Sequence, residues 1–583
     1  MTGREQQSYA PFSCFECKSR KVKCDRITPI CIRCTKDGAE CRYPTERRRP
    51  VQHQARVSAK PRLRELEIRL HELEDELKRK EGRTPSTDES ASGFGLMPTG
   101  RFEQLPPQGL VDKLTNLYFS TLWPENPMVH PGRYLTSLYQ PPHMRPPMCL
   151  QYIIMAGAAN VSVEHKSLAE PFYRRSRRYI EADEMGNDGY QVTVAHCQTW
   201  VLIGEFEAQN LWFSRASMST ARAVRLSQLL GLHVVDAASE MNRAIPMPVD
   251  WCQAEERRRT FWATFLFDRG ASITGTWPTL INATRIQTRL PSSNEAFKNG
   301  IEEPSLMLDQ ALNDHSGRPW PIFACRVIAM HLLSECFDVG VTQRMNPNAA
   351  VGDELESMLF WNRYESLSSS LEAAFSSLPY NMRCPENAHD ANAVSTSMLL
   401  HTATISIHFA GGARALTEGK ALPDSRRKVT EAAQQIVTTV ALATDIDARF
   451  RNPFFVFAAY TAATVFHKDY IQFREAQSLQ KLTALFDVMI SAGMKNPGFP
   501  ALLVVQLARE LETTAVDPLA MSKVRPIIES GDMSQQALTL DGNDSHTVVI
   551  CPVRHYLDNK DGSLMDERTP NDDEDFNAEA NIA

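Results

Sequence analysis

The chain has 583 residues, of which 43% are hydrophobic and 23% are charged, and its formal net charge at pH 7 is −7. This length exceeds what one compact core accommodates, so we expect at least two domains joined by linkers. The composition is that of a globular protein, and the first twelve residues contain no apolar segment of the secretory kind, so structural disulfides are not expected.

The charge is unevenly distributed along the chain. Residues 1–60 contain fourteen Lys and Arg against six Asp and Glu, a balance of +8, which leaves −15 for the remainder. This asymmetry predicts that the N-terminal end approaches a polyanion and that the rest of the chain does not.

Six of the thirteen cysteines lie within the first 41 residues. They form a C-x2-C-x6-C unit that is repeated at an offset of seventeen residues. Paired C-x2-C elements in a chain that is not secreted indicate a thiolate metal site. The six candidate ligands are Cys14, Cys17, Cys24, Cys31, Cys34 and Cys41.

The number of ligands predicts how the metal ions are arranged. Two separate tetrahedral zinc sites require eight ligands, so six cysteines can hold two Zn²⁺ ions only if two sulfurs bridge both metals. Six thiolates and two Zn²⁺ carry a net charge of −2, which lowers the cost of burying them. So short a segment has little hydrophobic core, so we expect metal binding to supply its folding energy.

The two six-residue inserts differ in charge. Four of the six residues between Cys17 and Cys24 are basic, whereas the insert between Cys34 and Cys41 has one basic and two acidic residues. A short helix starting at Cys17 would present its basic end to the major groove, where Lys or Arg donates to guanine and its neighbours bind phosphates. The candidate DNA-binding residues are Lys18, Arg20, Lys21, Lys23 and Arg26.

The segment from Cys14 to Cys41 resembles the fungal binuclear zinc cluster domain of transcription regulators. The resemblance implies that Cys14 and Cys31 are the bridging ligands of two zinc ions, and that Lys21, with Arg20 beside it, contacts a CGG-type triplet. It also implies a proline, here Pro29, that is often cis in such domains. Two alternatives stay open, a redox or structural zinc element and a zinc-stapled protein-interaction module that binds no DNA.

A basic linker and a candidate coiled coil follow the cysteines. Residues 47–61 contain prolines and Arg47–Arg49 and lack apolar periodicity, which is typical of an extended linker.

Leucines then recur at alternating steps of three and four, which predicts a parallel coiled coil over 62–81 and a homodimer. A solvated amphipathic helix is the alternative. The heptad residues are Leu63, Leu66, Leu70, Leu73 and Leu77.

Residues 82–109 are rich in Gly, Pro, Ser and Thr and mark a domain boundary, after which apolar residues recur at helical spacing. We expect a large all-α domain over 110–530, with helices near 149–159, 212–230 and 452–467. The uncharged stretch 391–413 contains polar residues and two histidines, which favours a buried helix over a membrane span.

Several motifs in this region resemble the fungal-specific transcription factor domain. They are YFSTLWPENPMVHPGRY (118–134), ARAVRLSQLLGLH (221–233) and EERRRTFWATFLFDRGASITGTWPTLI (255–281). Where that family often has Gly-Arg-Pro, this chain has Gly275, Thr276, Trp277 and Pro278, which adds an aromatic side chain that either alters a pocket or repacks the core.

The region carries no nucleophile-elbow, zinc-protease or Walker motif, so we do not expect an enzyme. Glu255 and Glu256 are expected to pair with Arg259, and His233 is expected to pack at a helix exit. The seven remaining cysteines have no ligand spacing and are expected to pack in the core. An enzyme or a metabolite receptor fused to a DNA-targeting module is the alternative function, and a small-molecule effector stays open.

The last forty-three residues carry eleven Asp and Glu against three Lys and Arg. Such an acidic tail is either an activation segment that binds a coactivator or a solvating tail. The sequence therefore predicts a nuclear, sequence-specific DNA-binding regulator of RNA polymerase II transcription, of the class that often governs a metabolic or secondary-metabolite pathway. Its expected parts are a disordered terminus (1–11), zinc cluster domain (12–46), basic linker (47–61), coiled coil (62–81), flexible linker (82–109), all-α domain (110–530) and acidic disordered tail (531–583).

Overall fold

The computed structural model describes residues 8–44, 106–185, 193–210, 212–237, 245–275, 277–345, 354–422, 424–442, 453–495 and 499–530. The chain divides into two compact units, Met1–Met97 and Pro98–Ala583. The expected basic linker, the heptad leucines, most of the flexible linker and the acidic tail lie outside the described residues.

The N-terminal unit contains two short helices, α1 (Phe15–Ser19) and α2 (Ile32–Asp37). Its buried cluster consists of four cysteines, while nearby Phe15 and Ile32 are about half exposed. So small an apolar interior is consistent with the expectation that metal binding stabilises this unit.

The regular secondary structure of the second unit is helical within its described residues. Its helices are α4 (Gln108–Thr121), α5 (Pro131–Leu138), η1 (Pro142–Met144), α6 (Met148–Val161), α7 (Lys166–Met185), α8 (Val194–Gln209), α9 (Phe213–Leu229), η2 (Leu232–Val234), α10 (Trp251–Gly275), η3 (Ala283–Arg285), α11 (Asn294–Asn299), α12 (Leu308–Leu312), α13 (Ile322–Met345), α14 (Glu354–Ser376), η4 (Tyr380–Met382), α15 (Ala391–Thr417), α16 (Asp424–Leu442), α18 (Pro453–Phe473), α19 (Ala476–Lys495), α20 (Phe499–Thr513) and α21 (Ala520–Ser530).

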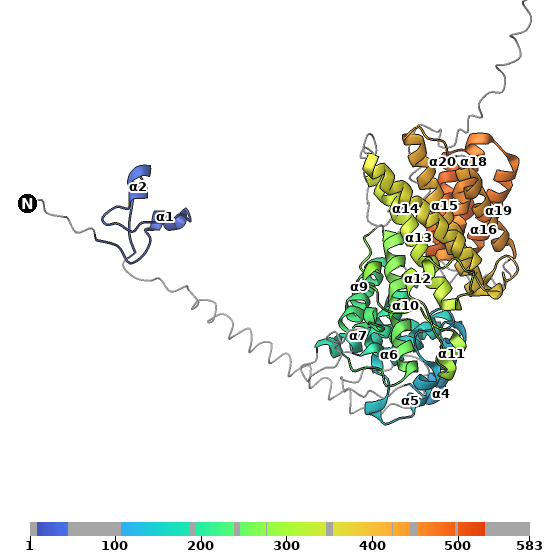
Figure 1. Cartoon of the computed structure of the whole chain (residues 1–583). Helices are drawn as coiled ribbons and strands as arrows, with labels where there is room; N and C mark the ends of the chain where they lie inside the picture. The colour runs from blue at the N-terminus through green and yellow to red at the C-terminus, as the bar shows by residue number, and fades with distance from the viewer. Residues whose placement is uncertain are drawn as a thin grey trace, which may run out of the picture. The chain divides into compact units, whose positions relative to one another are not determined.

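One continuous hydrophobic core extends from Val111 to Ile527. Helix α13 lies at its centre and packs against α10 on one side and against α14 and α15 on the other (Figure 1). Helix α15 also contacts α16 and α18, so neighbouring helices cover most of its surface. A helix enclosed in this way is apolar all round, which explains why residues 391–413 carry no charge.

The helices expected from the sequence are confirmed. Residues 149–159 lie in α6, residues 213–229 form α9, and Gly231, in the left-handed conformation at φ 69°, follows the end of α9. Helix α18 begins at Pro453, whose proline suits a first helical position. Among the described helices, none is both long and apolar enough to cross a membrane.

Two of the three family-like motifs are joined through buried polar contacts. Arg259 is fully buried and donates from Nη1 to the carbonyl of Pro127 at 3.0 Å and from Nη2 to the carbonyl of Ser292 at 2.7 Å. The backbone N–H of His130 donates to Glu256 at 3.2 Å. Segment 118–134 is therefore held against α10 by the charged residues of the third motif.

The expected ion pairing in α10 is correct for one carboxylate and wrong for the other. Arg259 Nε lies 2.8 Å from Glu255 Oε1, and both side chains are fully buried. Glu256 instead accepts from His130 and Gln198. The Glu255–Arg259 pair is thus a buried ion pair, and the i,i+4 spacing alone does not reveal its burial.

Two further expectations are settled at helix ends. His233 lies in η2, where its carbonyl accepts from Gln287 at 2.8 Å, consistent with a role at a helix exit. Trp277 is half exposed, and a Cβ added at Gly275 would lie 2.7 Å from its ring. The indole therefore covers the glycine at the end of α10, and Trp277 is not part of the buried core.

Candidate metal centre and nucleic-acid interface

Each half of the cysteine repeat builds the same local structure. Cys14 is the N-cap of α1 and Cys31 is the N-cap of α2, and each sulfur accepts a hydrogen bond at 3.4 Å from the backbone N–H three residues later. A sulfur at this position satisfies a helix N–H that would otherwise lack a partner. The C-x2-C spacing thereby places two sulfurs of each half on the same side of the first helical turn.

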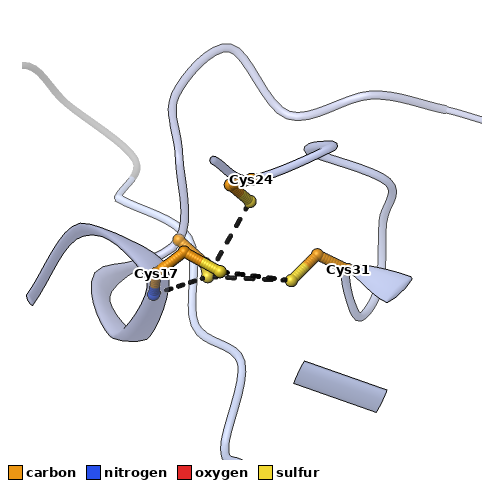
Figure 2. Close-up of side chains that lie close together, drawn as sticks. Cys17, Cys24 and Cys31 are labelled. Atoms are coloured by element: carbon orange, nitrogen blue, oxygen red, sulfur yellow. Dashed lines mark hydrogen bonds between the residues drawn. The ribbon is translucent and has the colours of Figure 1, made fainter. Parts of the chain in front are cut away.

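The two halves bring their sulfurs into contact. Cys14 Sγ lies 3.9 Å from Cys31 Sγ and 3.7 Å from Cys34 Sγ, and Cys17 Sγ lies 3.7 Å from Cys31 Sγ. Figure 2 shows the side chains of Cys17, Cys24 and Cys31 pointing toward one another. All six thiols are free of disulfides.

The sulfurs form two overlapping groups of four. One group contains Cys14, Cys17, Cys24 and Cys31, and the other contains Cys14, Cys31, Cys34 and Cys41. Zn–S bonds of about 2.3 Å in a tetrahedron place sulfurs about 3.8 Å apart. The observed separations fit this geometry, and the two cysteines common to both groups are those that the resemblance assigned as bridging.

The pKa values of the thiols are shifted in both directions, since that of Cys17 is raised and those of Cys31 and Cys41 are lowered. Burial, followed by the thiol contacts with Cys14 and Cys31, raises the pKa of Cys17 to about 12. Thiolates packed this closely repel one another, so they require a cation that compensates their charge. A pair of Zn²⁺ ions provides this compensation and displaces the thiol protons.

The loop between the two halves is fixed by contacts that the sequence analysis did not single out. Asp25 accepts from the backbone N–H groups of Ile27 and Ile32, both at 3.0 Å, and the Tyr43 hydroxyl donates to the carbonyl of Ile27 at 2.7 Å. The Thr28–Pro29 peptide bond is cis, as the resemblance implied. An Asp just after a ligand cysteine, with its short hydrogen-bonding side chain, was the available signal.

The N-terminal residues need one correction. Residues 8–10 lie within the terminus that was expected to be disordered, but Ala10 N–H donates to the carbonyl of Arg26 at 2.7 Å and Thr28 N–H donates to the carbonyl of Ser8 at 3.1 Å. These backbone bonds to a distant loop cannot be inferred from local composition. They hold the segment that carries Arg26.

The first helix also differs from expectation. It begins at Phe15, two residues before Cys17, and ends at Ser19, so Lys18 lies in its last turn and Lys21 lies beyond it. The N-cap sulfur of Cys14 sets this earlier start. The basic insert is therefore mostly an exposed loop, and only its first residues are helical.

The candidate DNA-binding residues separate into two groups. All five side chains are exposed. Arg20 lies 2.7 Å from Glu16 and 3.5 Å from Asp37 and is thus neutralised within the protein. The other four form no ion pair with any described residue, so their charges face solvent: Lys18, Lys21, Lys23 and Arg26.

Lys21 has a strained backbone. Its φ is 55°, in the left-handed region, and the residue seventeen positions later, Gly38, has a φ of 62°. Both follow a helix and precede an N–H that donates 3.0 Å back to a cysteine carbonyl. Glycine adopts this conformation without strain whereas lysine does not. The second half of the repeat has a glycine at this position, and the first half has a lysine despite the strain. This difference indicates a role for the lysine side chain.

Comparison with known proteins agrees with this geometry. Residues 12–50 match the fungal Zn(2)-Cys(6) binuclear cluster domain, and residues 115–387 match the fungal specific transcription factor domain. The second of these descriptions names a transcription factor domain.

Three curated relatives are similar to this chain at low identity. A citrinin biosynthesis transcriptional activator of Monascus ruber is 26% identical over 52% of this chain and 67% of its own length. An abscisic acid cluster transcription factor of Leptosphaeria maculans is 24% identical over 62% of this chain and 73% of its own length. A pigment biosynthesis transcriptional activator of Monascus ruber is 28% identical over 46% of this chain and 48% of its own length.

The two domain matches together span more than half of the 583 residues. They coincide with the two parts built above, a pair of four-sulfur groups beside exposed basic side chains and a large all-α domain. The chain therefore belongs to the fungal binuclear zinc cluster transcription factors, whose N-terminal domain binds two zinc ions and DNA.

Proposed function

We propose that this protein is a nuclear regulator of RNA polymerase II transcription that controls a secondary-metabolite gene cluster. The relatives described above support the pathway class, because their names assign them to citrinin, abscisic acid and pigment biosynthesis. The observation that carries the molecular function is the adjacency of two four-sulfur groups and four exposed cations that form no ion pair with a described residue.

The six N-terminal cysteines are the proposed zinc ligands. Cys14 and Cys31 bridge the two ions, since only these two sulfurs belong to both groups of four. Bound zinc compensates the charge of the thiolates and cross-links the two helices, which stabilises a unit whose apolar interior is small. The cysteines hold the basic loop at a fixed orientation.

The charged partners around each basic side chain suggest which role it has in DNA binding. The Lys21 ammonium has no carboxylate partner among the described residues, and the Val22 N–H bond to the Cys17 carbonyl holds its backbone, which suits Lys21 to contact guanine in a CGG-type triplet. Lys18, Lys23 and Arg26 are the proposed phosphate contacts. Arg20 has carboxylate partners on both sides, so its proposed role is to orient the loop.

Three further assignments rest on sequence. The heptad leucines of 62–81 support a homodimer that binds two triplets, with the basic linker setting their spacing. The acidic tail of 531–583 is the proposed coactivator contact. The all-α domain is the proposed location of any small-molecule effector.

The test is binding of the full chain to labelled DNA duplexes. Zinc-loaded protein is expected to prefer a duplex with CGG triplets over a scrambled duplex of equal length, and a chelator is expected to remove the preference. Equal affinity for both duplexes in the zinc-loaded state would refute the assignment. Mapping of bound genomic sites then checks whether the targets lie in one biosynthetic cluster.

A further inference from the structure

A second group of metal-type ligands lies in the all-α domain and contains no residue of the cysteine repeat. Cys149 is the second residue of α6, Asp183 lies in the last turn of α7 and His196 is the third residue of α8. One ligand atom from each lies within 4.8 Å of the other two. His196 Nε2 is 3.4 Å from Asp183 Oδ2.

Neighbouring groups fix the orientation of these side chains. Thr193 lies against His196 Nδ1 with its hydroxyl Oγ1 at 2.8 Å and with its backbone N–H at 3.3 Å, so Nδ1 has partners and Nε2 faces the group. Ser176 Oγ donates to the Cys149 carbonyl at 2.7 Å and thereby joins α7 to the start of α6. Zinc binding through Nε2 requires the tautomer in which Nδ1 carries the proton and donates to Thr193 Oγ1, in place of the Nδ1 that accepts from the Thr193 N–H.

The chemistry of the three ligands matches a divalent cation. A thiolate and a carboxylate balance the charge of one Zn²⁺, and the neutral imidazole adds none, so the occupied site is uncharged in a buried environment. Cys149 also lies at a helix N-terminus, where the helix dipole favours a thiolate.

The distances allow tetrahedral coordination after small side-chain rotations. Zinc with sulfur, nitrogen and oxygen ligands separates those atoms by about 3.3 to 3.6 Å. The His196 and Asp183 pair already lies at 3.4 Å, and the upper limit of 4.8 Å exceeds the required separation by about 1 Å. The side chain of Asp183 is 26% exposed, which gives an ion a route from solvent.

A nucleophilic role for this group does not fit. Cys149 is fully buried, and its sulfur lies 3.5 Å from Thr199 Oγ1. A substrate therefore cannot approach the thiol, whereas a metal ion that enters beside Asp183 can.

We propose that Cys149, Asp183 and His196 bind one zinc ion, separate from the two ions of the cysteine repeat, with a water in the fourth position. This ion joins the starts of α6 and α8 to the end of α7 and stabilises the all-α domain. The proposal is independent of DNA binding.

The test is the zinc content of the purified full chain after dialysis against zinc-free buffer. Wild-type protein is expected to hold three zinc ions per chain, and Cys149→Ser and His196→Gln two. Cys197→Ser is the matched control, because Cys197 is equally buried and adjacent to His196 but belongs to no ligand group. It is expected to retain three.

A second measurement uses Co²⁺ as the probe. Cys31→Ser weakens the N-terminal centre, and adding Cys149→Ser to this variant is expected to remove one further cobalt ion and part of the thiolate charge-transfer band. Two zinc ions in the wild type, or equal cobalt content and band in Cys31→Ser and Cys31→Ser/Cys149→Ser, would overturn the proposal. Either result leaves the preference for CGG duplexes unaffected, so the two proposals fail separately.

Discussion

The left-handed backbone of Lys21 allows its side chain and its main chain to be tested separately. Replacement by glycine removes both the ammonium and the backbone strain at φ 55°. Replacement by alanine removes the ammonium and keeps the strain. The two variants should therefore lose DNA specificity alike and differ in stability.

The magnitudes follow from these two effects. The left-handed conformation destabilises the folded state of a non-glycine residue by roughly 1 to 2 kcal/mol, and glycine avoids this cost. Glycine also loses more conformational entropy on folding, which offsets about 0.5 to 1 kcal/mol of the gain. Lys21→Gly should thus be about 0.5 to 1 kcal/mol more stable than Lys21→Ala. Loss of one base contact costs about 1 to 3 kcal/mol, which corresponds to about a 5- to 150-fold loss of discrimination.

Both quantities are measurable on the full chain. Discrimination is the ratio of affinities for a CGG duplex and a scrambled duplex at one salt concentration, since salt changes all phosphate contacts. Stability is the temperature of zinc release, followed with a zinc-responsive dye. Lys36→Ala is the matched control, because Lys36 is also exposed and basic but lies on α2, in the second repeat.

Two results would refute the reasoning. If both Lys21 variants keep the preference for CGG, Lys21 does not contact the bases. If alanine and glycine release zinc at the same temperature, the left-handed backbone is not strained in the protein.

Three further predictions concern other parts of the chain. Cys31→Ser should release more zinc than Cys24→Ser, measured as metal per chain, because only Cys31 belongs to both sulfur groups; equal losses would contradict the sharing. Arg259→Met should destabilise the all-α domain by about 3 to 5 kcal/mol in thermal unfolding, since its carboxylate partner stays buried. The exposed pair at Arg427 is the control, and Arg427→Met should change stability by less than about 1 kcal/mol. Burial, followed by a nearby carboxylate, raises the pKa of Glu205 to about 7, so the folded state binds this proton more tightly and loses stability as pH rises from about 4.5 to 7. Glu205→Gln should therefore stabilise the protein more at pH 8 than at pH 5, and an equal effect at both would disprove the assignment.

The N-terminal centre was largely predictable because its ligands are close in sequence. The C-x2-C spacing places two sulfurs in one helical turn, and the repeat at seventeen residues duplicates the arrangement. The start of α1 was mispredicted because a cysteine sulfur acts as its N-cap. The pairing of Arg20 with Asp37 was missed because it joins the two halves.

Contacts between distant segments were not predictable in the same way. Cys149 was expected only to pack in the core, since no residue near it in sequence has ligand spacing. The packing of α6, α7 and α8 brings Asp183 and His196 to it. Likewise, the spacing of Glu255 and Arg259 predicted an ion pair but gave no sign that Pro127 and Ser292 would enclose it.

The sequence by itself determined the zinc centre, the basic loop and the all-α class, because ligand spacing, charge and helical periodicity are local properties of a chain. Only the tertiary structure decided which cations stay unpaired, which charged residues are buried and which ligands meet across helices. Those outcomes depend on contacts between segments tens to more than a hundred residues apart, and no local pattern encodes such contacts.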